Sequence, residues 1–267
     1  MQPLLLLLAF FLFPMTRAGE IIGGHEAKAH SRPYMAYLEF QYNTSLVMCG
    51  GFLIHENFVL TAAHCMERPL NIQGSQITVT LGAHNIEQRE KTQQVIHVKR
   101  SIPHPQYNPE KITNDIMLLQ LEEKAKETKE VQIIKPKKES WVKPGTVCQV
   151  AGWGLLDLNG KFPNTLQEVE MTVQKDEECK KHFHNYDSET QICAGDPDTE
   201  KGSYEGDSGG PLLCNNVVQA IVSYGSCEIN PQVYTKLSPY VAWIEKTMKE
   251  HTLQAANEDH SLSSHVS

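Results

Sequence analysis

The stretch Gly206-Asp207-Ser208-Gly209-Gly210-Pro211 (GDSGGP) places one serine inside a run of glycines. By itself such a run is typical of a tight turn, because glycine adopts backbone angles that other residues avoid. A serine hydroxyl is a poor nucleophile until a base removes its proton. The stretch therefore raises the question of whether another part of the chain supplies that base.

Two further stretches supply candidate partners. Thr61-Ala62-Ala63-His64-Cys65 contains a histidine, the base best suited to neutral pH, and Asn114-Asp115-Ile116-Met117-Leu118-Leu119 begins an apolar strand with a carboxylate. Each alone has a structural alternative, a core histidine or a strand-end cap. The order His64, Asp115, Ser208 nevertheless matches one known order of the serine, histidine and aspartate system. We predict Ser208 as nucleophile, His64 as base and Asp115 as the group that orients the imidazole.

The glycines around Ser208 have a separate predicted role. They allow the backbone N–H groups of Gly206 and Ser208 to converge on one point and form an oxyanion hole. One such donor is typically worth about 3–4 kcal/mol of transition-state stabilisation.

The remainder of the chain contains many short β-type runs separated by Gly, Pro and Asn, which favours a β-sandwich or barrel. It lacks the helix–strand alternation of subtilisin-like or α/β-hydrolase enzymes. The charged stretch 122–138 is predicted to be an interdomain connection, with a surface helix as the alternative. Residues 239–251 carry apolar side chains at helical spacing and predict a terminal helix, followed by a disordered polar tail over 252–267.

The N-terminus indicates export. Residues 1–18 (MQPLLLLLAFFLFPMTRA) contain an apolar run of about ten residues, too short to span a bilayer, and predict a signal peptide, with an anchor helix as the alternative. The sequon at Asn43 predicts a glycosylation site and fits a secretory route. The net charge of -8 argues against nucleic acid as a partner.

Seven cysteines follow the predicted leader. In an exported chain they indicate disulfides, and neither a CxxC pair nor an HExxH motif suggests zinc. The odd count leaves one thiol over, which must be reactive, buried or intermolecular. No metal or organic cofactor is implied.

Several motifs together resemble one family: IIGGHEAKAHSRPYMAYL, CGGFLI, VLTAAHC, LGAHNI, TNDIMLLQL, VAGWG, GDSGGPL and IVSYG. The chain is similar to the chymotrypsin-like serine proteases of the trypsin fold, and within them to the granzymes and the mast-cell and neutrophil proteases. The resemblance implies an all-β fold of two packed antiparallel six-stranded β-barrels with a C-terminal α-helix. The peptidase domain would cover 21–251, with barrels over about 21–125 and 126–251.

The resemblance also implies an activation step. In this family the new N-terminus made by cleavage pairs with the carboxylate beside the nucleophile, which here would be Ile21 with Asp207. Residues 19–20 (Gly-Glu) then resemble an activation dipeptide that an activating dipeptidyl peptidase removes. The alternative is signal cleavage directly after Glu20.

The disulfide pattern of the family implies three pairs: Cys49–Cys65, Cys148–Cys214 and Cys179–Cys193. Cys227 has no mate, because the position that bridges to it in many relatives is Tyr204 here. A free thiol near the pocket rim and an intermolecular bridge both stay open for Cys227.

Substrate preference in the family rests on the pocket floor, neck and one further position, which correspond to Gly202, Gly225 and Gln232. Trypsin-like relatives need an aspartate at the floor, and aspartate-cleaving granzymes place an arginine at the third position. The resemblance therefore implies cleavage after large uncharged residues: Phe, Tyr, Leu, Met and, through hydrogen bonds to Gln232, Asn or Gln. The further substrate-binding positions are Ser203, Ser223 and Tyr224, and the last two offer backbone groups to an extended substrate.

Two functions remain from different classes. The first is an active serine endopeptidase, secreted or stored in secretory or cytolytic granules and monomeric. Its partners would be polypeptide substrates and serine protease inhibitors, with no membrane partner. The second is a catalytically silent relative that acts as a binding or antimicrobial protein. The presence of His64, Asp115 and Ser208 favours the enzyme.

Overall fold

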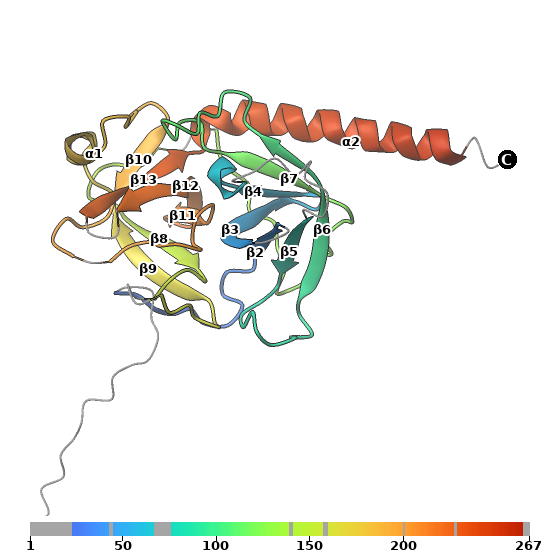
Figure 1. Ribbon diagram of the computed structural model, residues 1–267, viewed down its shortest axis with the longest axis horizontal. Coiled ribbons are helices and arrows are strands. Elements are labelled where there is room, and N and C mark those ends of the chain that lie inside the picture. The colour runs from blue at the N-terminus through green and yellow to red at the C-terminus, as the bar shows by residue number, and fades with distance from the viewer. Residues whose placement is uncertain are drawn as a thin grey trace, which may run out of the picture.

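The computed structural model describes residues 23–42, 45–66, 76–138, 141–156, 160–199, 201–226 and 229–263. Two β-sheets lie side by side, and a long helix runs along one edge of the pair (Figure 1). The predicted signal peptide, the dipeptide 19–20, Ile21, Asn43 and Cys227 lie outside the described residues. In the described part of the chain, no helix combines the length and apolarity needed to cross a membrane.

The first sheet is a closed barrel of six antiparallel strands in the order β2-β3-β4-β7-β6-β5. Its strands are β2 (Met35–Gln41), β3 (Leu46–His55), β4 (Phe58–Thr61), β5 (Gln76–Leu81), β6 (Gln94–Pro103) and β7 (Met117–Leu121). Side chains from β2, β3 and β4 that are fully buried, such as Leu38, Phe52 and Phe58, fill its interior. The predicted N-terminal barrel is confirmed.

The second sheet has seven strands in the order β1-β9-β8-β11-β12-β13-β10. They are β1 (His25–Glu26), β8 (Val147–Gly152), β9 (Gln167–Thr172), β10 (Gln191–Ala194), β11 (Pro211–Cys214), β12 (Val217–Ser226) and β13 (Ile229–Lys236). A single bridge between Val173 and Ala194 joins the segment after β9 to β10. The six strands from β9 to β10 agree with the fold expected for the second half of the chain, and β1 adds a short seventh strand along the edge of β9.

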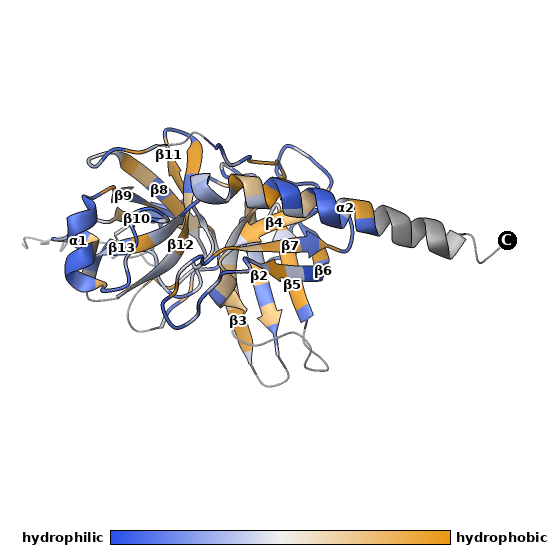
Figure 2. Cartoon of the chain, turned by 90° about the horizontal axis from the view of Figure 1, so that it is seen from above, coloured by the Kyte–Doolittle hydropathy of each residue, from blue (hydrophilic) through white to orange (hydrophobic). Residues whose placement is uncertain are grey.

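Four helical segments occur in the described ranges of the chain: η1 (Ala63–Cys65), α1 (Asp176–His182), η2 (Ser238–Tyr240) and α2 (Val241–Ser263). Helix α1 is hydrophilic along its length, whereas the strands carry most of the strongly apolar residues (Figure 2). Helix α2 continues to Ser263, beyond His251 where the sequence predicts its end. The tail predicted as disordered is therefore helical over 252–263.

The N-terminal segment packs on the second sheet and the C-terminal helix packs on the first barrel, the reverse of what the predicted division of the chain implies. Strand β1 comes from the N-terminal segment and pairs with β9 of the second sheet. Helix α2 follows the second sheet, yet its Trp243 ring lies against the ring of His104, directly after β6, with centroids 4.9 Å apart. Ile244 lies in a buried cluster that joins the interior of the first barrel to residues of β11 and β12, and Trp243 and Met248 pack against this cluster. The predicted division at 125/126 therefore does not describe how the two halves are packed.

The charged stretch 122–138 contains no helix or strand in its described length and follows the surface of the first barrel. The N–H of Gln132 donates to the carbonyl of Pro33, and the N–H of Ile134 donates to the carbonyl of Leu53. Val131 is fully buried in the first core. The prediction of a connection is therefore favoured over that of a surface helix.

Candidate active site

His64 and Asp115 come from the first barrel and contact each other. His64 lies in η1, directly after β4, and Asp115 lies two residues before β7. The Nδ1 of His64 is 2.7 Å from the Oδ2 of Asp115, and the backbone N–H of His64 donates to Oδ1 at 2.9 Å. The pairing of Thr61 with Met117 places the end of β4 beside the start of β7, which brings the two residues together.

Asp115 is fully buried, and its carboxylate accepts a third hydrogen bond from the hydroxyl of Ser223 at 2.6 Å. Burial opposes ionisation of this carboxyl. The nearby His64 ring and the hydrogen bonds from His64 and Ser223 outweigh that effect and hold the pKa of Asp115 below its ordinary value. Asp115 is therefore ionised at neutral pH and fixes the imidazole through Nδ1, while the His64 side chain stays 27% exposed.

Ser208 lies in the turn before β11, where the backbone conformation requires glycine at two positions. Gly206 and Gly209 have φ values of +97° and +83°. A Cβ atom at Gly209 would lie 2.0 Å from the Oγ1 of Thr61, so no larger residue fits there. The carbonyl of Ser208 accepts the N–H of Gly50 at 2.8 Å, which ties the turn to β3 of the first barrel.

The two predicted oxyanion donors lie in the same turn. Neither the N–H of Gly206 nor that of Ser208 donates to an acceptor within the described residues. The turn is closed by the bonds from Asp207 N–H to the Tyr204 carbonyl and from Gly210 N–H to the Asp207 carbonyl, both 2.9 Å. The backbone thus leaves two N–H groups of the same turn, on either side of that of Asp207, for a ligand oxygen.

Asp207 is also fully buried, in a site built from backbone. Its Oδ1 accepts the N–H of Gly154 at 2.8 Å and its Oδ2 accepts the N–H of Tyr204 at 3.0 Å. Burial raises the pKa of Asp207 to about 6, and the two backbone N–H groups only partly oppose this. A Cβ atom at Gly152 would lie 2.1 Å from Oδ1, so the carboxylate is closely enclosed.

A cavity of about 220 Å³ opens beside Ser208. Its lining includes the predicted pocket residues Ser203, Ser223, Tyr224, Gly225 and Gln232, together with Tyr204, Glu205, Val222 and Ser226. Sequence reasoning did not assign Glu205, Val222 or Ser226 to the pocket. Glu205 could have been predicted as a pocket residue because it directly precedes Gly206. No local sequence signal distinguishes Val222 and Ser226 from other strand residues.

Gln232 is the buried polar group of this cavity, with 4% of its surface exposed. Its Oε1 accepts the N–H and the hydroxyl of Ser203 at 3.0 and 2.7 Å, and its Nε2 donates to the Ser203 carbonyl at 2.9 Å. Gly202 does not line the cavity directly. A Cβ atom there would lie 2.7 Å from the Gln232 Nε2, so Gly202 makes room for the glutamine.

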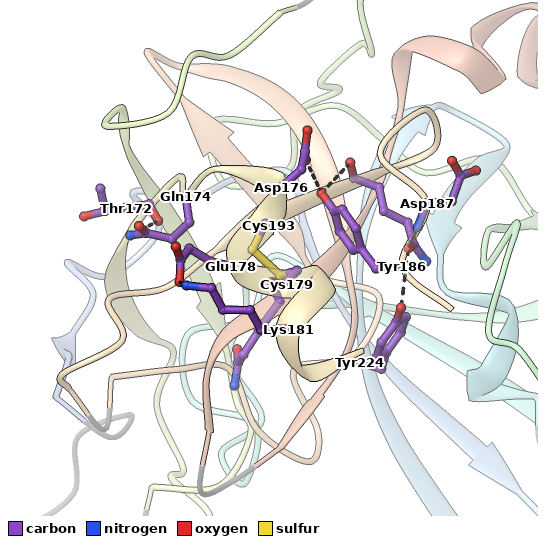
Figure 3. The surroundings of a disulfide bond; sticks show 12 residues. Thr172, Gln174, Asp176, Glu178, Cys179, Lys181, Tyr186, Asp187, Cys193 and Tyr224 are labelled. Carbon is purple, nitrogen blue, oxygen red and sulfur yellow. Dashed lines mark hydrogen bonds and ion pairs between the residues drawn. A yellow bond between two sulfur atoms is a disulfide. The ribbon is translucent and has the colours of Figure 1, made fainter. Parts of the chain in front are cut away.

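The three predicted disulfides are confirmed: Cys49–Cys65, Cys148–Cys214 and Cys179–Cys193. The first joins β3 to η1 and holds the segment that carries His64. The third joins α1 to β10 (Figure 3). Within the described ranges, no three His, Cys, Asp or Glu side chains are placed to hold a metal ion.

Comparison with known proteins places this site in a family. The family model described as Trypsin matches residues 21–244, most of the chain. The chain belongs to the trypsin family. Among trypsin-family proteins, human granzyme B is 59% identical over 254 residues, covering 94% of this chain and all of the relative. Human cathepsin G is 51% identical over 255 residues, covering 95% of this chain and 97% of the relative.

A solved structure of a protein designated GrC agrees with the trypsin-family fold described above. It superposes with a TM-score of 0.79 at 50% sequence identity and covers 86% of this chain and all of that chain. The protein is therefore a serine endopeptidase of the chymotrypsin-like class, and its relatives include granzymes and cathepsin G.

Proposed function

We propose that this endopeptidase is secreted or stored in granules and cleaves polypeptides after large uncharged residues: Phe, Tyr, Leu and Met, with Asn or Gln as further substrates. The observation that supports this most directly is the cavity beside Ser208, whose buried polar group is the neutral amide of Gln232. A buried charged side chain needs a partner of opposite charge. Among the described residues that line the cavity, the one charged side chain is the exposed carboxylate of Glu205.

The contacts of Gln232 also favour the amide substrates. One N–H of its Nε2 donates to Ser203, and the second has no acceptor among the described residues. That N–H can donate to the side-chain carbonyl of a substrate Asn or Gln. A substrate carboxylate would find a neutral donor at Gln232 and would be repelled by the carboxylate of Glu205 in the cavity lining.

The proposed reaction uses the three residues described above. The Ser208 Oγ attacks the carbonyl carbon of the scissile bond while the Nε2 of His64 takes its proton, and the ionised Asp115 stabilises the imidazolium. The N–H groups of Gly206 and Ser208 stabilise the resulting oxyanion. The imidazolium then gives its proton to the leaving amine, the C–N bond breaks, and water releases the acyl group from Ser208 by the same proton path.

We further propose that activation removes residues 19–20 and that the new amine of Ile21 pairs with Asp207. The support is the environment of Asp207, a fully buried carboxylate whose described partners are two backbone N–H groups. A cation at this site would compensate its burial. The partners of this scheme are an activating dipeptidyl peptidase and serine protease inhibitors.

A substrate library tests the proposal with two chains, one that begins at Ile21 and one that begins at Gly19. We expect cleavage after Phe, Tyr, Leu or Met by the chain that begins at Ile21 only. Cleavage after Asp or Lys would contradict the role given to Gln232, and equal activity of the two chains would contradict the activation step.

Ser208→Ala is the control for the catalytic assignment, and we expect it to lower kcat by about 10⁶-fold, as when a nucleophile of this type is removed. A fluorophosphonate probe should label the chain that begins at Ile21 but not the variant. Absence of labelling in the parent chain would favour the silent binding protein instead.

A further inference from the structure

Gln191 is a buried glutamine in β10, with only 2% of its surface exposed. It lies at the edge strand of the second sheet and pairs with Thr235 of β13. A buried amide destabilises the fold unless its oxygen and nitrogen are hydrogen-bonded. The partners that this amide selects are therefore informative about its role.

The side chain of Gln191 connects three segments. Its Oε1 accepts the N–H of Asp187 at 2.9 Å and the hydroxyl of Tyr224 at 3.4 Å. Its Nε2 donates to the carbonyl of Ile112 at 3.2 Å. Ile112 belongs to the loop before β7, so this one amide joins the second sheet to the first barrel.

Tyr224 is the contact on the substrate side. It lines the cavity beside Ser208, and its ring meets the edge of the Phe183 ring with centroids 5.4 Å apart. Burial raises the pKa of Tyr224, so its hydroxyl stays protonated and can donate to Gln191. Both supports of the tyrosine come from the segment closed by Cys179–Cys193, around which Tyr186, Asp187 and Tyr224 gather (Figure 3).

Ile112 is the contact on the catalytic side. It precedes Asp115 in a loop where Ile112 and Asn114 have φ values of +50° and +53°. Such angles are costly for residues other than glycine and persist where neighbouring groups hold them. Tyr240 donates to the Asn114 side chain at 2.9 Å, and Gln191 donates to the Ile112 carbonyl.

We propose that Gln191 is a positioning residue that aligns Tyr224, a wall of the substrate cavity, with the loop that carries Asp115. The inference rests on the catalytic role proposed for Asp115 and on the cavity proposed to receive substrate. A residue needed only for folding would affect stability alone. A positioning residue changes kcat and KM through two separable contacts.

Three substitutions separate the two contacts. At a pH where the introduced carboxyl is ionised, Gln191→Glu keeps an oxygen for Asp187 and Tyr224 but replaces the donor that faces Ile112 with an acceptor. Tyr224→Phe removes the hydroxyl on the substrate side only. Gln191→Met removes both contacts at similar volume.

Gln219→Met is the matched control. Gln219 is a 7% exposed glutamine in β12 of the same sheet, and its side chain makes no hydrogen bond within the described residues.

The measurement is kcat and KM of each chain beginning at Ile21, on a peptide of the best sequence found in the library. We expect Gln191→Glu to lower kcat and Tyr224→Phe to raise KM, each by about three- to tenfold, as for the loss of one hydrogen bond. Gln191→Met should do both, and Gln219→Met should match the parent within about twofold.

The inference fails if Gln191→Glu and Tyr224→Phe both match the parent, or if the variants differ from it in thermal stability only. If Gln191→Met does not fold, Gln191→Glu and Tyr224→Phe still test the positioning role of Gln191. Fluorophosphonate labelling of the parent chain distinguishes a failure of the proposed function from a failure of the role given to Gln191. An unlabelled parent contradicts the proposed function. A labelled parent with unaffected variants contradicts only the role of Gln191.

Discussion

Asp115 and Asp207 show how one side chain acquires opposite properties in two fully buried sites. Asp115 faces the His64 ring and the Ser223 hydroxyl, and its pKa lies below the ordinary value despite burial. Asp207 has two backbone N–H partners, and burial raises its pKa to about 6. The difference follows from the imidazole beside Asp115, because a nearby cation favours the ionised form of a carboxyl.

This contrast predicts a pH dependence for the chain that retains residues 19–20. The folded chain holds the Asp207 proton up to pH of about 6, whereas the unfolded chain releases it near 4. The free energy of unfolding should therefore fall by about 3 kcal/mol as the pH rises from about 3 to about 7, with most of the fall between pH 4 and 6. Urea unfolding of this chain and of its Asp207→Asn variant, compared at several pH values, measures the contribution.

The Asp207→Asn variant should be the more stable of the two above pH 6, and the difference should vanish below pH 4. In the chain beginning at Ile21 the sign should reverse at neutral pH, because the substitution removes the proposed partner of the amine. The same pH dependence in both chains would contradict the proposed pairing.

Among single residues, the sequence identifies His64, Asp115 and Ser208 as catalytic candidates, because each lies in a compact motif with its own chemistry. Gln191 has no such signal. Its partners at 112 and 224 are distant in the sequence, and only the folded structure shows that one amide contacts both of them together with the nearby Asp187. The same holds for Val222 and Ser226, which are ordinary strand residues until the cavity is seen.

Among the elements, α1 and β10 depend on the Cys179–Cys193 disulfide that joins them. Helix α1 is short and hydrophilic and buries only Cys179, so its own packing contributes little. Replacing both cysteines with serine should lower the free energy of unfolding by about 3 kcal/mol, the typical effect for a loop of this length. It should also raise KM, because Phe183 and Gln191 lie within this loop and contact Tyr224.

Urea unfolding and kinetics of the double variant check both effects. The matched control is replacement of Cys148 and Cys214, which join β8 to β11 within the second sheet. That variant should lose stability with KM unchanged. A rise of KM in both variants would show that general loosening, rather than the support of Tyr224, is responsible.

Most strands of the first barrel are predictable because short runs of β-type residues, separated by turn residues, identify them individually. Strand β1 is not, since a pair of residues has no periodicity, and its pairing with β9 depends on the approach of two distant segments. The extension of α2 past His251 also escapes the pattern. The apolar spacing ends there while the polar residues that follow are still able to form helix.

In the molecule as a whole, each end of the chain packs against the opposite half, and this joins the two halves into one unit. Strand β1 adds the N-terminal segment to the second sheet, and α2 brings the C-terminal segment against the first barrel, where Trp243 meets His104 and His251 meets Arg100. Because each half lacks part of its packing without the other, we expect a single unfolding transition rather than two.

Truncation tests this arrangement. A chain that ends at Gln254 keeps Trp243, Ile244 and Met248, together with the contacts of Arg100 to His251 and Gln254. Its urea midpoint should match that of the full chain. A chain that ends at Tyr240 loses the apolar contacts and should be destabilised by at least about 2–5 kcal/mol, the effect of deleting one large buried side chain. Equal midpoints for the two truncated chains would show that α2 does not support the first barrel.

Helix α2 ends far from the second sheet, which carries the cavity, and its last turns project past the first barrel (Figure 1). The two ends of the chain therefore offer different opportunities for handling the protein. An affinity tag or surface attachment at the C-terminus leaves the entrance to the cavity open. The same addition before Ile21 would occupy the amine on which the proposed activation depends, so immobilised protein intended for substrate screening is best anchored through the helix.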